Sequence, residues 1–319
     1  MFSHGHHGHG HFWNEAHQLL RKRDKQPWNL GTVLWCILLP LLLFAHVYYC
    51  CAFSFRFYHT IIAICVGPCL ALLLCAGVTA YAVRLCKLSF RARGALSLTV
   101  SLWSALVLAI YQGDMNYWLH MNGYLNLQDM ASYTNIDPSS DRGQTFMDAG
   151  QIYFKEGTFV VKEKAMAFQN IGTYCVAPIV RQPIENPVAV SQLNISSKVA
   201  VPPSGTFDFW AVGKDCCDPS GGEFTCGEVA NDRARAGIRM MRDDIRPFFV
   251  LAVQEWTAWV GAPSAHPLFF HWVEDPLSTL DSFYKKASTM FGQHVASFFF
   301  MNLVGTLLLL WLLYGAGIR

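Results

Sequence analysis

The chain has 319 residues, 53% of them hydrophobic, and a formal net charge of +2 at neutral pH. That near-balance hides an uneven division, because the polar segment 113–290 carries 14 basic and 20 acidic residues and therefore has a net charge of −6. An acidic segment of this size argues against nucleic acid as a partner, since nucleic-acid binding needs a basic face.

Four hydrophobic segments follow one another along the chain, at residues 32–53, 61–82, 95–111 and 294–314. Each is long enough, or nearly so, to cross a hydrocarbon core of about 30 Å at about 1.5 Å per helical residue. The third is the shortest, because Arg91 and Arg93 stop it from extending upstream. We therefore predict a membrane protein in which a four-helix transmembrane bundle carries a large α+β domain between its third and fourth spans.

The basic residues outside that domain predict the orientation. Ten of the 24 Lys and Arg lie outside residues 113–290, and nine of those ten share one side if the N-terminus is cytosolic. Cytosolic loops carry such an excess. We predict a cytosolic His-rich tail and basic segment at 1–31, three transmembrane helices at 32–111, a lumenal or extracellular domain at 112–293, and a fourth helix with a short cytosolic end at 294–319. The membrane is expected to be the plasma membrane or an endomembrane.

Two features of the domain favour an oxidising compartment. Asn194 begins an N-glycosylation sequon with Ile195 and Ser196, and such a sequon is useful only in a lumen. The domain also holds an even number of cysteines, which suits disulfide bonds. These are Cys175, Cys216, Cys217 and Cys226.

The pairing of those cysteines is restricted but not settled by the sequence. The vicinal residues Cys216 and Cys217 can bond each other only with strain. Two schemes remain, and each joins Cys175 to one member of the pair and Cys226 to the other. A zinc site is the less favoured alternative, because the C-x2-C spacing is absent.

The N-terminal tail is rich in histidine, and its imidazoles include those of His4, His6, His7, His9 and His11. Such spacing can capture Zn²⁺, Cu²⁺ or Ni²⁺. A Gly/His tract has no rigid frame, however, so we expect a disordered tail, with weak metal buffering as the alternative. No cofactor is predicted for the protein.

The domain shows both strand and helix patterns. Residues 151–161 alternate on both sides of a Lys155-Glu156-Gly157 turn, which predicts a β-hairpin. Residues 172–180 and 207–212 are predicted strands, because aromatic and β-branched residues dominate them. From 228 to 260 apolar residues recur at helical spacing, and Pro247 is expected to divide two helices. A further helix is expected from Pro276 into the last span.

No established catalytic motif occurs in the sequence. The weak candidates for acid/base or metal chemistry cluster just before the last span, and they are His266, His271, Glu274 and Asp275. A packed loop edge is the alternative interpretation. A domain face resting on lipid headgroups is a further alternative, because aromatic residues are frequent there; they are Trp256, Trp259, Phe269, Phe270 and Trp272.

A partial calcium-loop spacing occurs at Asp137, Ser139, Asp141 and Asp148. Arg142 stands where the turn of such a loop needs glycine. An ordinary polar turn is therefore the favoured interpretation.

The predicted spans contain no Asp, Glu, Lys or Arg, although ion-coupled transporters usually place such groups at that depth. Asn302 is expected to hydrogen-bond between helices, and His46 lies near the lumenal end of the first span. Small residues, among them Gly67 and Ser101, allow helices to approach closely. A packed anchor fits this pattern better than a pore.

The chain carries two resemblances. The order of three spans, a cysteine-bearing loop and a fourth span resembles tetraspanins, as does the Cys216-Cys217 pair, although Asp218 stands where tetraspanins carry glycine. Residues 174–179 and 207–217 look like motifs of uncharacterised multi-pass membrane proteins of dinoflagellate-type protists. The first resemblance implies topology only, and the second implies neither an activity nor functional residues.

These features predict a membrane-anchored ectodomain that binds a protein partner or a small ligand, or organises partners, at a cell or organelle surface. The lipid bilayer is its other partner, and oligomers are compatible with this interpretation. The alternatives are an ectoenzyme that uses residues 266–275 and an accessory subunit of a transporter or channel. Titratable groups converging in a cleft would favour the enzyme, and a water-lined path between the spans would favour transport.

Overall fold

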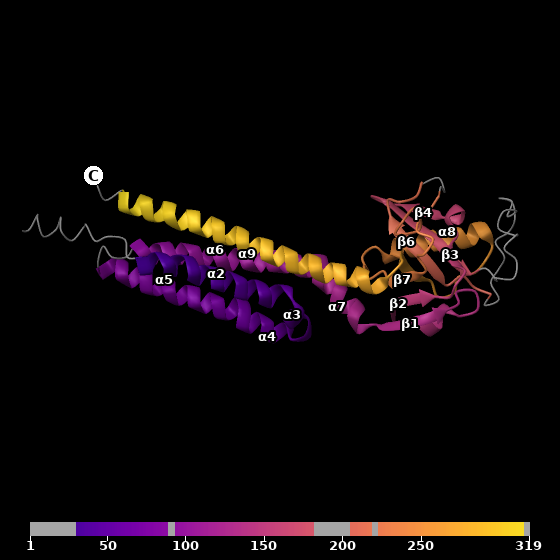
Figure 1. The fold of residues 1–319 in the computed structure, drawn as a ribbon, viewed down its shortest axis with the longest axis horizontal. Helices are drawn as coiled ribbons and strands as arrows, with labels where there is room; N and C mark the ends of the chain where they lie inside the picture. The colour runs from indigo at the N-terminus through magenta and orange to yellow at the C-terminus, as the bar shows by residue number, and fades with distance from the viewer. Residues whose placement is uncertain (1–29, 89–92, 182–204, 219–222, 316–319) are drawn as a thin grey trace, which may run out of the picture. The chain divides into compact units, whose positions relative to one another are not determined.

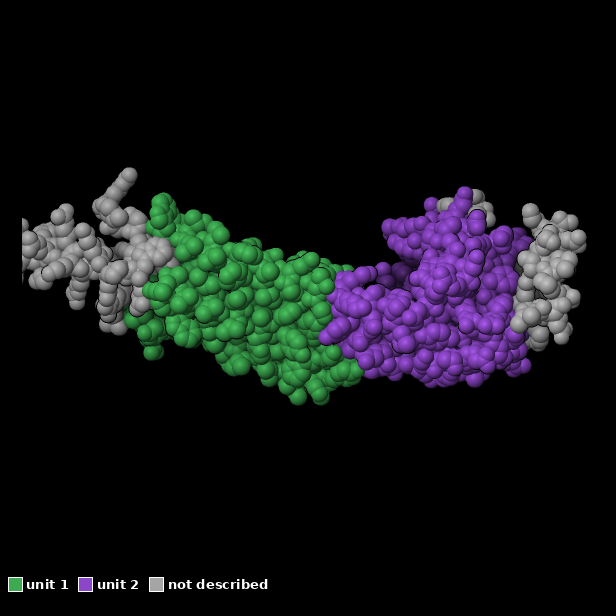
Figure 2. Space-filling model, in the orientation of Figure 1, with its two compact units in different colours: residues 1–119, 287–319 green, residues 120–286 purple. Residues whose placement is uncertain are grey.

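The structure is a computed structural model that describes residues 30–88, 93–181, 205–218 and 223–315. It divides into two compact units (Figures 1 and 2). Unit 1 consists of Met1–Leu119 and Ala287–Arg319, and unit 2 is His120–Lys286. Unit 2 therefore begins and ends inside the predicted domain 112–293.

Four helical stretches are long and apolar enough to cross a membrane: Val33–Ala52, Thr60–Leu85, Gly94–Asp129 and Pro276–Leu309. The first stretch is α2 (Leu30–Ala52), and the fourth is α9 (Pro276–Gly315). The second follows the short α3 (Ser54–Tyr58) and consists of α4 (Thr60–Ile64), η1 (Cys65–Cys69) and α5 (Leu70–Leu88). The third consists of α6 (Arg93–Asn116), η3 (Tyr117–Met121) and α7 (Asn122–Asp129). The third and fourth helices are longer than the predicted apolar segments, because a helix continues beyond the point where its hydrophobicity ends. The expected helix from Pro276 into the last span is confirmed.

Asn302 of α9 compensates for a proline in α2. Pro40 lies inside α2 and has no N–H to donate to the carbonyl of Cys36, four residues earlier. The Asn302 side-chain amide donates to the carbonyl oxygens of Ile37 at 3.1 Å and Cys36 at 3.4 Å. An unpaired carbonyl in an apolar environment is costly, so this contact joins α9 to α2 at the point where α2 needs a donor. The predicted interhelical role of Asn302 is confirmed.

A polar side chain from another helix also lies near the second proline. Pro68 lies in η1, which is one π-helical turn, and the carbonyl oxygen of Val66 in this turn accepts a hydrogen bond from Nε2 of His46 at 3.2 Å. Gly67 permits the close approach, because a Cβ there would lie 2.7 Å from the Cβ of Cys50. Pro40 and Pro68 thus each lie near a polar side chain from another helix.

Arg56 lies between the first and second predicted spans and is the one of the ten basic residues outside segment 113–290 that the predicted orientation places away from the cytosol. Its charge is neutralised within unit 1. Its guanidinium contacts Asp114 of α6 at 2.6 Å and donates to the carbonyl oxygen of Cys51 at 3.0 Å. It also lies over the ring of Tyr117, 4.3 Å from the centroid. This ion pair joins the short α3 to the third helix.

Unit 2 is built on a mixed eight-stranded sheet (Figure 1). The strands are β1 (Ala131–Ile136), β2 (Ala149–Phe154), β3 (Thr158–Val160), β4 (Met166–Gln169), β5 (Thr173–Arg181), β6 (Phe209–Lys214), β7 (Ala236–Arg239) and β8 (Leu268–Val273). Their order is β1-β2-β7-β8-β6-β5-β3, and β4 pairs with β5 outside this path. The β1–β2 and β6–β8 pairs are parallel, and the other pairs are antiparallel.

Alternation along the strands divides the core of unit 2 into two layers. On one face, Trp210 and Phe269 pack with Phe249 and Trp256 of α8 (Arg246–Val260). The opposite face holds a separate cluster, which includes Cys175, Phe209, Phe270, Trp272, Phe224 and Phe146. Phe146 comes from the 3₁₀ turn η4 (Gly143–Phe146), and a further 3₁₀ turn, η5, spans Lys162–Lys164.

The structure confirms three local predictions. The two predicted strands correspond to β5 and β6, and the second of the two helices expected between 228 and 260 is α8, with Pro247 in its first turn. Small residues also lie where helices meet, since Gly67 contacts Cys50 and Ser101 is buried.

Two other local predictions are wrong, as is the alternative of a lipid-facing aromatic surface. The β2 and β3 strands exist, but they form no hairpin, because β2 pairs with β1 and β7 while β3 pairs with β5. The first predicted helix of 228–260 contains the strand β7, in which Ile238 packs inward at a spacing that also suits a helix. The aromatic cluster is no lipid-facing surface, since only Trp259 of those five side chains is exposed. The other four fill the two layers of the core, because apolar area is stabilised by removal from water.

The coupling of Pro40 and Asn302 is testable by a double-mutant cycle. Asn302→Leu should lower the unfolding free energy of the full chain in detergent by about 1 kcal/mol, because two carbonyls of α2 lose their donor. In a Pro40→Ala background residue 40 regains an N–H, so the same substitution should cost clearly less. Equal costs in the two backgrounds would show that Asn302 does not act through this proline.

Candidate functional site

The four cysteines of unit 2 meet where β5 and β6 run side by side. Cys175 lies on β5, Cys216 and Cys217 directly follow β6, and Cys226 belongs to the same core cluster as Cys175. The structure pairs Cys175 with Cys217, at a Cα–Cα distance of 5.9 Å, and Cys216 with Cys226, at 5.2 Å. This is one of the two schemes that the sequence left open.

Gly213 allows the sulfur atoms to gather. It faces Cys175 in the β5–β6 register, and a Cβ at this position would lie 2.5 Å from Cβ and Sγ of Cys226 and 2.6 Å from Sγ of Cys216. Cys175 and Cys226 are buried, whereas Cys216 and Cys217 are partly exposed. A larger residue than glycine would therefore push the buried and the accessible cysteines apart.

The sulfur atoms of Cys175, Cys216 and Cys226 lie within 4.8 Å of one another. They form the only group of three or more potential metal ligands that meets this criterion in the described ranges of the chain. Zinc binds cysteine as thiolate, and all three sulfurs are engaged in disulfides. The disulfide interpretation therefore fits these residues better than the zinc alternative.

A hairpin tip projects beside the disulfides. It consists of Asn170, Ile171 and Gly172, which join β4 to β5. Ile171 is 99% exposed and has φ 53°, a left-handed conformation that is a true outlier for a β-branched residue. The neighbouring Asp215 has φ 59° and exchanges two hydrogen bonds of 2.7 Å with the backbone of Thr173. The tip is thus held in place from behind.

The candidates of residues 266–275 do not converge. His266 precedes β8, His271 lies within it, and Glu274 and Asp275 follow it. The strand alone is about 16 Å long at about 3.3 Å per residue, so it separates His266 from the two carboxylates. Asp275 caps α9 by accepting from the Leu277 N–H at 3.0 Å. The Glu274 carboxylate accepts from the Asn231 amide at 2.7 Å. This geometry matches a loop edge rather than an acid/base group.

His271 differs from the other members of that set. It stands on β8 opposite Ile238, and its ring is exposed. The surrounding protein nevertheless desolvates the imidazole and lowers its pKa, and a hydrogen bond with the backbone of Val212 opposes this shift. The folded protein therefore disfavours the charged imidazolium at this position.

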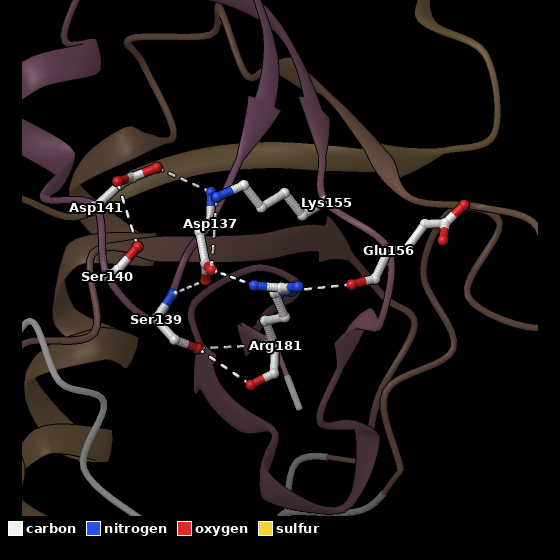
Figure 3. A network of polar contacts seen from close by, with 7 residues as sticks. All are labelled: Asp137, Ser139, Ser140, Asp141, Lys155, Glu156 and Arg181. Carbon is white, nitrogen blue, oxygen red and sulfur yellow. Dashed lines mark hydrogen bonds and ion pairs between the residues drawn. The ribbon is translucent and has the colours of Figure 1, made fainter. Parts of the chain in front are cut away.

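The suspected calcium loop is a polar network in which the Arg181 guanidinium occupies the place of a cation beside Asp137 (Figure 3). The Asp137 carboxylate, on a residue only 7% exposed, contacts the Arg181 guanidinium at 2.5 Å and accepts from the Ser139 N–H at 3.1 Å. Asp141 accepts from the Asp137 N–H at 2.9 Å. Asp148 lies outside this network and accepts from the Tyr133 hydroxyl at 2.9 Å. The favoured polar turn agrees with this geometry.

Sequence reasoning missed the buried carboxylate of Asp208. This residue is 2% exposed and accepts hydrogen bonds from the N–H groups of Gly143 at 2.9 Å and Ala265 at 3.1 Å, and from the Thr206 hydroxyl at 3.1 Å. It thereby holds three loops together at one end of the sheet. In the sequence, Asp208 stands between Phe207 and Phe209, both of which are buried. An acid flanked by two such residues is the pattern that indicates a buried carboxylate.

Two sets of predicted residues lie outside the described ranges, namely the tail histidines His4, His6, His7, His9 and His11, and the sequon residue Asn194. The comparisons add no assignment: no protein-family model, no curated protein and no solved structure matches this chain. The tetraspanin-like topology and the resemblance to protist proteins remain predictions.

Calcium should not stabilise the protein, because Arg181 already neutralises Asp137. Millimolar CaCl₂ should leave the melting temperature where MgCl₂ leaves it. Arg181→Gln should lower the unfolding free energy by about 2–3 kcal/mol, since it leaves a nearly buried carboxylate without its partner. Lys155→Gln, whose ammonium lies 3.9 Å from Asp137 and is more exposed, is the control and should cost less than about 1 kcal/mol. A rise in melting temperature specific to calcium would contradict this account.

The lowered pKa of His271 predicts a pH dependence. The folded protein resists protonation of this ring, so the unfolded chain binds the additional proton once the pH falls below the ordinary histidine value of about 6.5. Stability should therefore decrease as the pH falls from about 6.5, and His271→Gln should remove part of that decrease in unfolding curves recorded at about pH 7.5 and about pH 5. His266→Gln is the control for loss of an exposed imidazole. An unchanged difference between the two pH values would refute the assignment to His271.

Proposed function

We propose that this protein is a membrane-anchored binding ectodomain. In this proposal four helices cross a plasma membrane or endomembrane, both termini are cytosolic, and unit 2 lies on the lumenal or extracellular side, where it binds a protein partner. The observation that carries the proposal is the hairpin tip with its exposed, left-handed Ile171.

The polar side chains of the helical unit support an anchoring role. Asn302 and His46 hydrogen-bond to carbonyls beside prolines of other helices. The hydroxyl of Tyr48 lies 3.0 Å from Nδ1 of His294, and the Asn116 amide donates to the Ala287 carbonyl at 3.1 Å. Groups that are engaged in joining helices are not free to coordinate a transported substrate. These contacts favour the anchor over the accessory-transporter alternative.

The hairpin tip supports binding because it is unfavourable for the isolated domain on two counts. A left-handed conformation costs an L-residue about 1–2 kcal/mol, and an exposed isoleucine gains nothing from burial. An apolar pocket on a partner would bury that side chain, and the braced backbone would present it with little loss of entropy on binding. Strain at an exposed position favours a functional role for this residue.

The same tip suggests the class of partner. Ile171 is a single apolar side chain, and its neighbours Asn170 and Asp215 are polar and exposed. A small apolar anchor surrounded by a polar rim is the usual composition of a protein–protein contact. We therefore propose a protein partner with a pocket that accepts one branched aliphatic side chain.

Ile171→Gly separates binding from stability. Glycine adopts the left-handed region without steric cost, so the full chain in detergent should keep or slightly raise its melting temperature. A photoreactive residue at position 171 should give a discrete adduct in native membranes, whereas one at Met147, an exposed apolar residue of the same unit, should not. The purified partner should bind Ile171→Gly at least about tenfold more weakly and Met147→Ala normally. A lower melting temperature together with no adduct at 171 would make Ile171 a structural residue.

A further inference from the structure

We propose that the four cysteines of unit 2 form a thiol–disulfide exchange site for a small thiol such as reduced glutathione, in which two-electron reduction releases Cys216 and Cys217 as a surface dithiol while Cys175 and Cys226 become bonded to each other. The proposal is independent of the partner-binding role of Ile171. It assigns a chemical activity to cysteines that the fold otherwise uses only as crosslinks.

The sulfur atoms of the two disulfides lie close together. Sγ of Cys175 lies within 4.8 Å of both sulfurs of the other disulfide, Cys216 and Cys226. Cys226 also lies directly over Gly213, the cross-strand neighbour of Cys175. Cross-strand neighbours have Cβ atoms about 5 Å apart, so a short movement of the sulfurs suffices to bond Cys175 to Cys226.

The four cysteines divide by burial into two accessible and two buried residues. Cys216 and Cys217 are partly exposed, and they are the sulfurs that a thiol in solution can reach. Cys175 and Cys226 are buried in the core cluster behind them, with exposures of 0% and 5%. Each of the observed disulfides therefore joins one accessible sulfur to one buried sulfur, and exchange would sort them into an accessible pair and a buried pair.

The chemistry balances with two equivalents of thiol. A thiolate attacks Sγ of Cys216, the Cys216–Cys226 bond breaks, and the electron pair leaves on Cys226. The Cys226 thiolate attacks Sγ of Cys175, the Cys175–Cys217 bond breaks, and Cys217 leaves as a thiolate that takes a proton. A second thiolate then attacks the thiol sulfur bound to Cys216, which releases the oxidised disulfide of the small thiol, and Cys216 takes the second proton.

The products differ from those of ordinary reduction. Two thiols are oxidised, the protein gains two S–H groups, and one disulfide, Cys175–Cys226, remains inside the core. That buried bond would keep β5 linked to the segment that carries Cys226. The surface would present adjacent thiols, which are suited to reducing or capturing a further thiol-reactive substrate.

The test is limited reduction of the full chain in detergent with reduced glutathione, followed by alkylation at low pH and cleavage after Lys214 and Glu223. These two cleavages separate the Cys216-Cys217 peptide from Cys226. We expect the peptide 215–223 to carry two alkyl groups while a Cys175–Cys226 crosslinked peptide accumulates. A peptide 215–223 with one alkyl group that is still crosslinked to Cys175 would overturn the proposal, because it is the product of simple reduction. Resistance of both disulfides until the protein unfolds would overturn it equally.

A variant tests the exchange step without a reductant. Cys217→Ser leaves Cys175 unpaired beside the Cys216–Cys226 bond, so we expect at least about half of the folded protein to carry Cys175–Cys226 with Cys216 free to alkylate. Cys175→Ala with Cys217→Ala is the matched control, because it removes the same disulfide and the attacking thiol, and it should retain Cys216–Cys226. A Cys217→Ser protein that retains only Cys216–Cys226 contradicts the proposal. If Cys217→Ser does not fold, the peptide map of the wild-type chain alone decides.

Discussion

Two disulfides in one small patch of unit 2 constrain the rest of the molecule. Cys175–Cys217 and Cys216–Cys226 link β5, the end of β6 and a returning segment across one face of the sheet. Such bonds form and persist in oxidising compartments. The proposed topology, which places the domain on the side of the membrane opposite to the cytosol, is consistent with these bonds and with the distribution of basic residues.

A second constraint comes from the apolar surroundings that the four long helices imply. Backbone groups freed by a proline cannot find water within hydrocarbon. Asn302 and His46 supply donors beside Pro40 and Pro68, and these contacts also join separate helices. Asn302 donates to the Cys36 carbonyl that Pro40 leaves without its helical partner, and both side chains join separate helices, which accounts for polar residues in these apolar helices.

Part of this fold follows from local sequence pattern. The apolar segments, the strands β5 and β6, the core helix α8 and the continuous α9 were all predictable, because their periodicity and their boundaries are local. The partners of β2 and β3 were not, since strand pairing depends on long-range contacts that a turn signal does not encode. The strand β7 was mistaken for a helix, because Ile238 and Met241 suit a helical period as well.

The candidate sites likewise combine features that are visible in the local sequence with features that depend on tertiary contacts. The cysteine set was visible in the sequence, and its pairing was reduced to two schemes, but the choice between them depends on how Gly213 lets Cys226 approach Cys175. The left-handed conformation of Ile171 and the ligands of Asp208 arise from tertiary structure. The sequence around Asp137 has some calcium-loop character, yet the Arg181 that fills the site lies on a distant strand.

The central claim is that the four helices anchor a disulfide-bonded domain outside the cytosol. Protease added to sealed microsomes that contain the full chain tests it most directly. The account predicts a protected fragment that includes residues 120–286, that changes mobility when disulfides are reduced, and that is digested once detergent opens the vesicles. Digestion of this segment in intact vesicles would contradict the account.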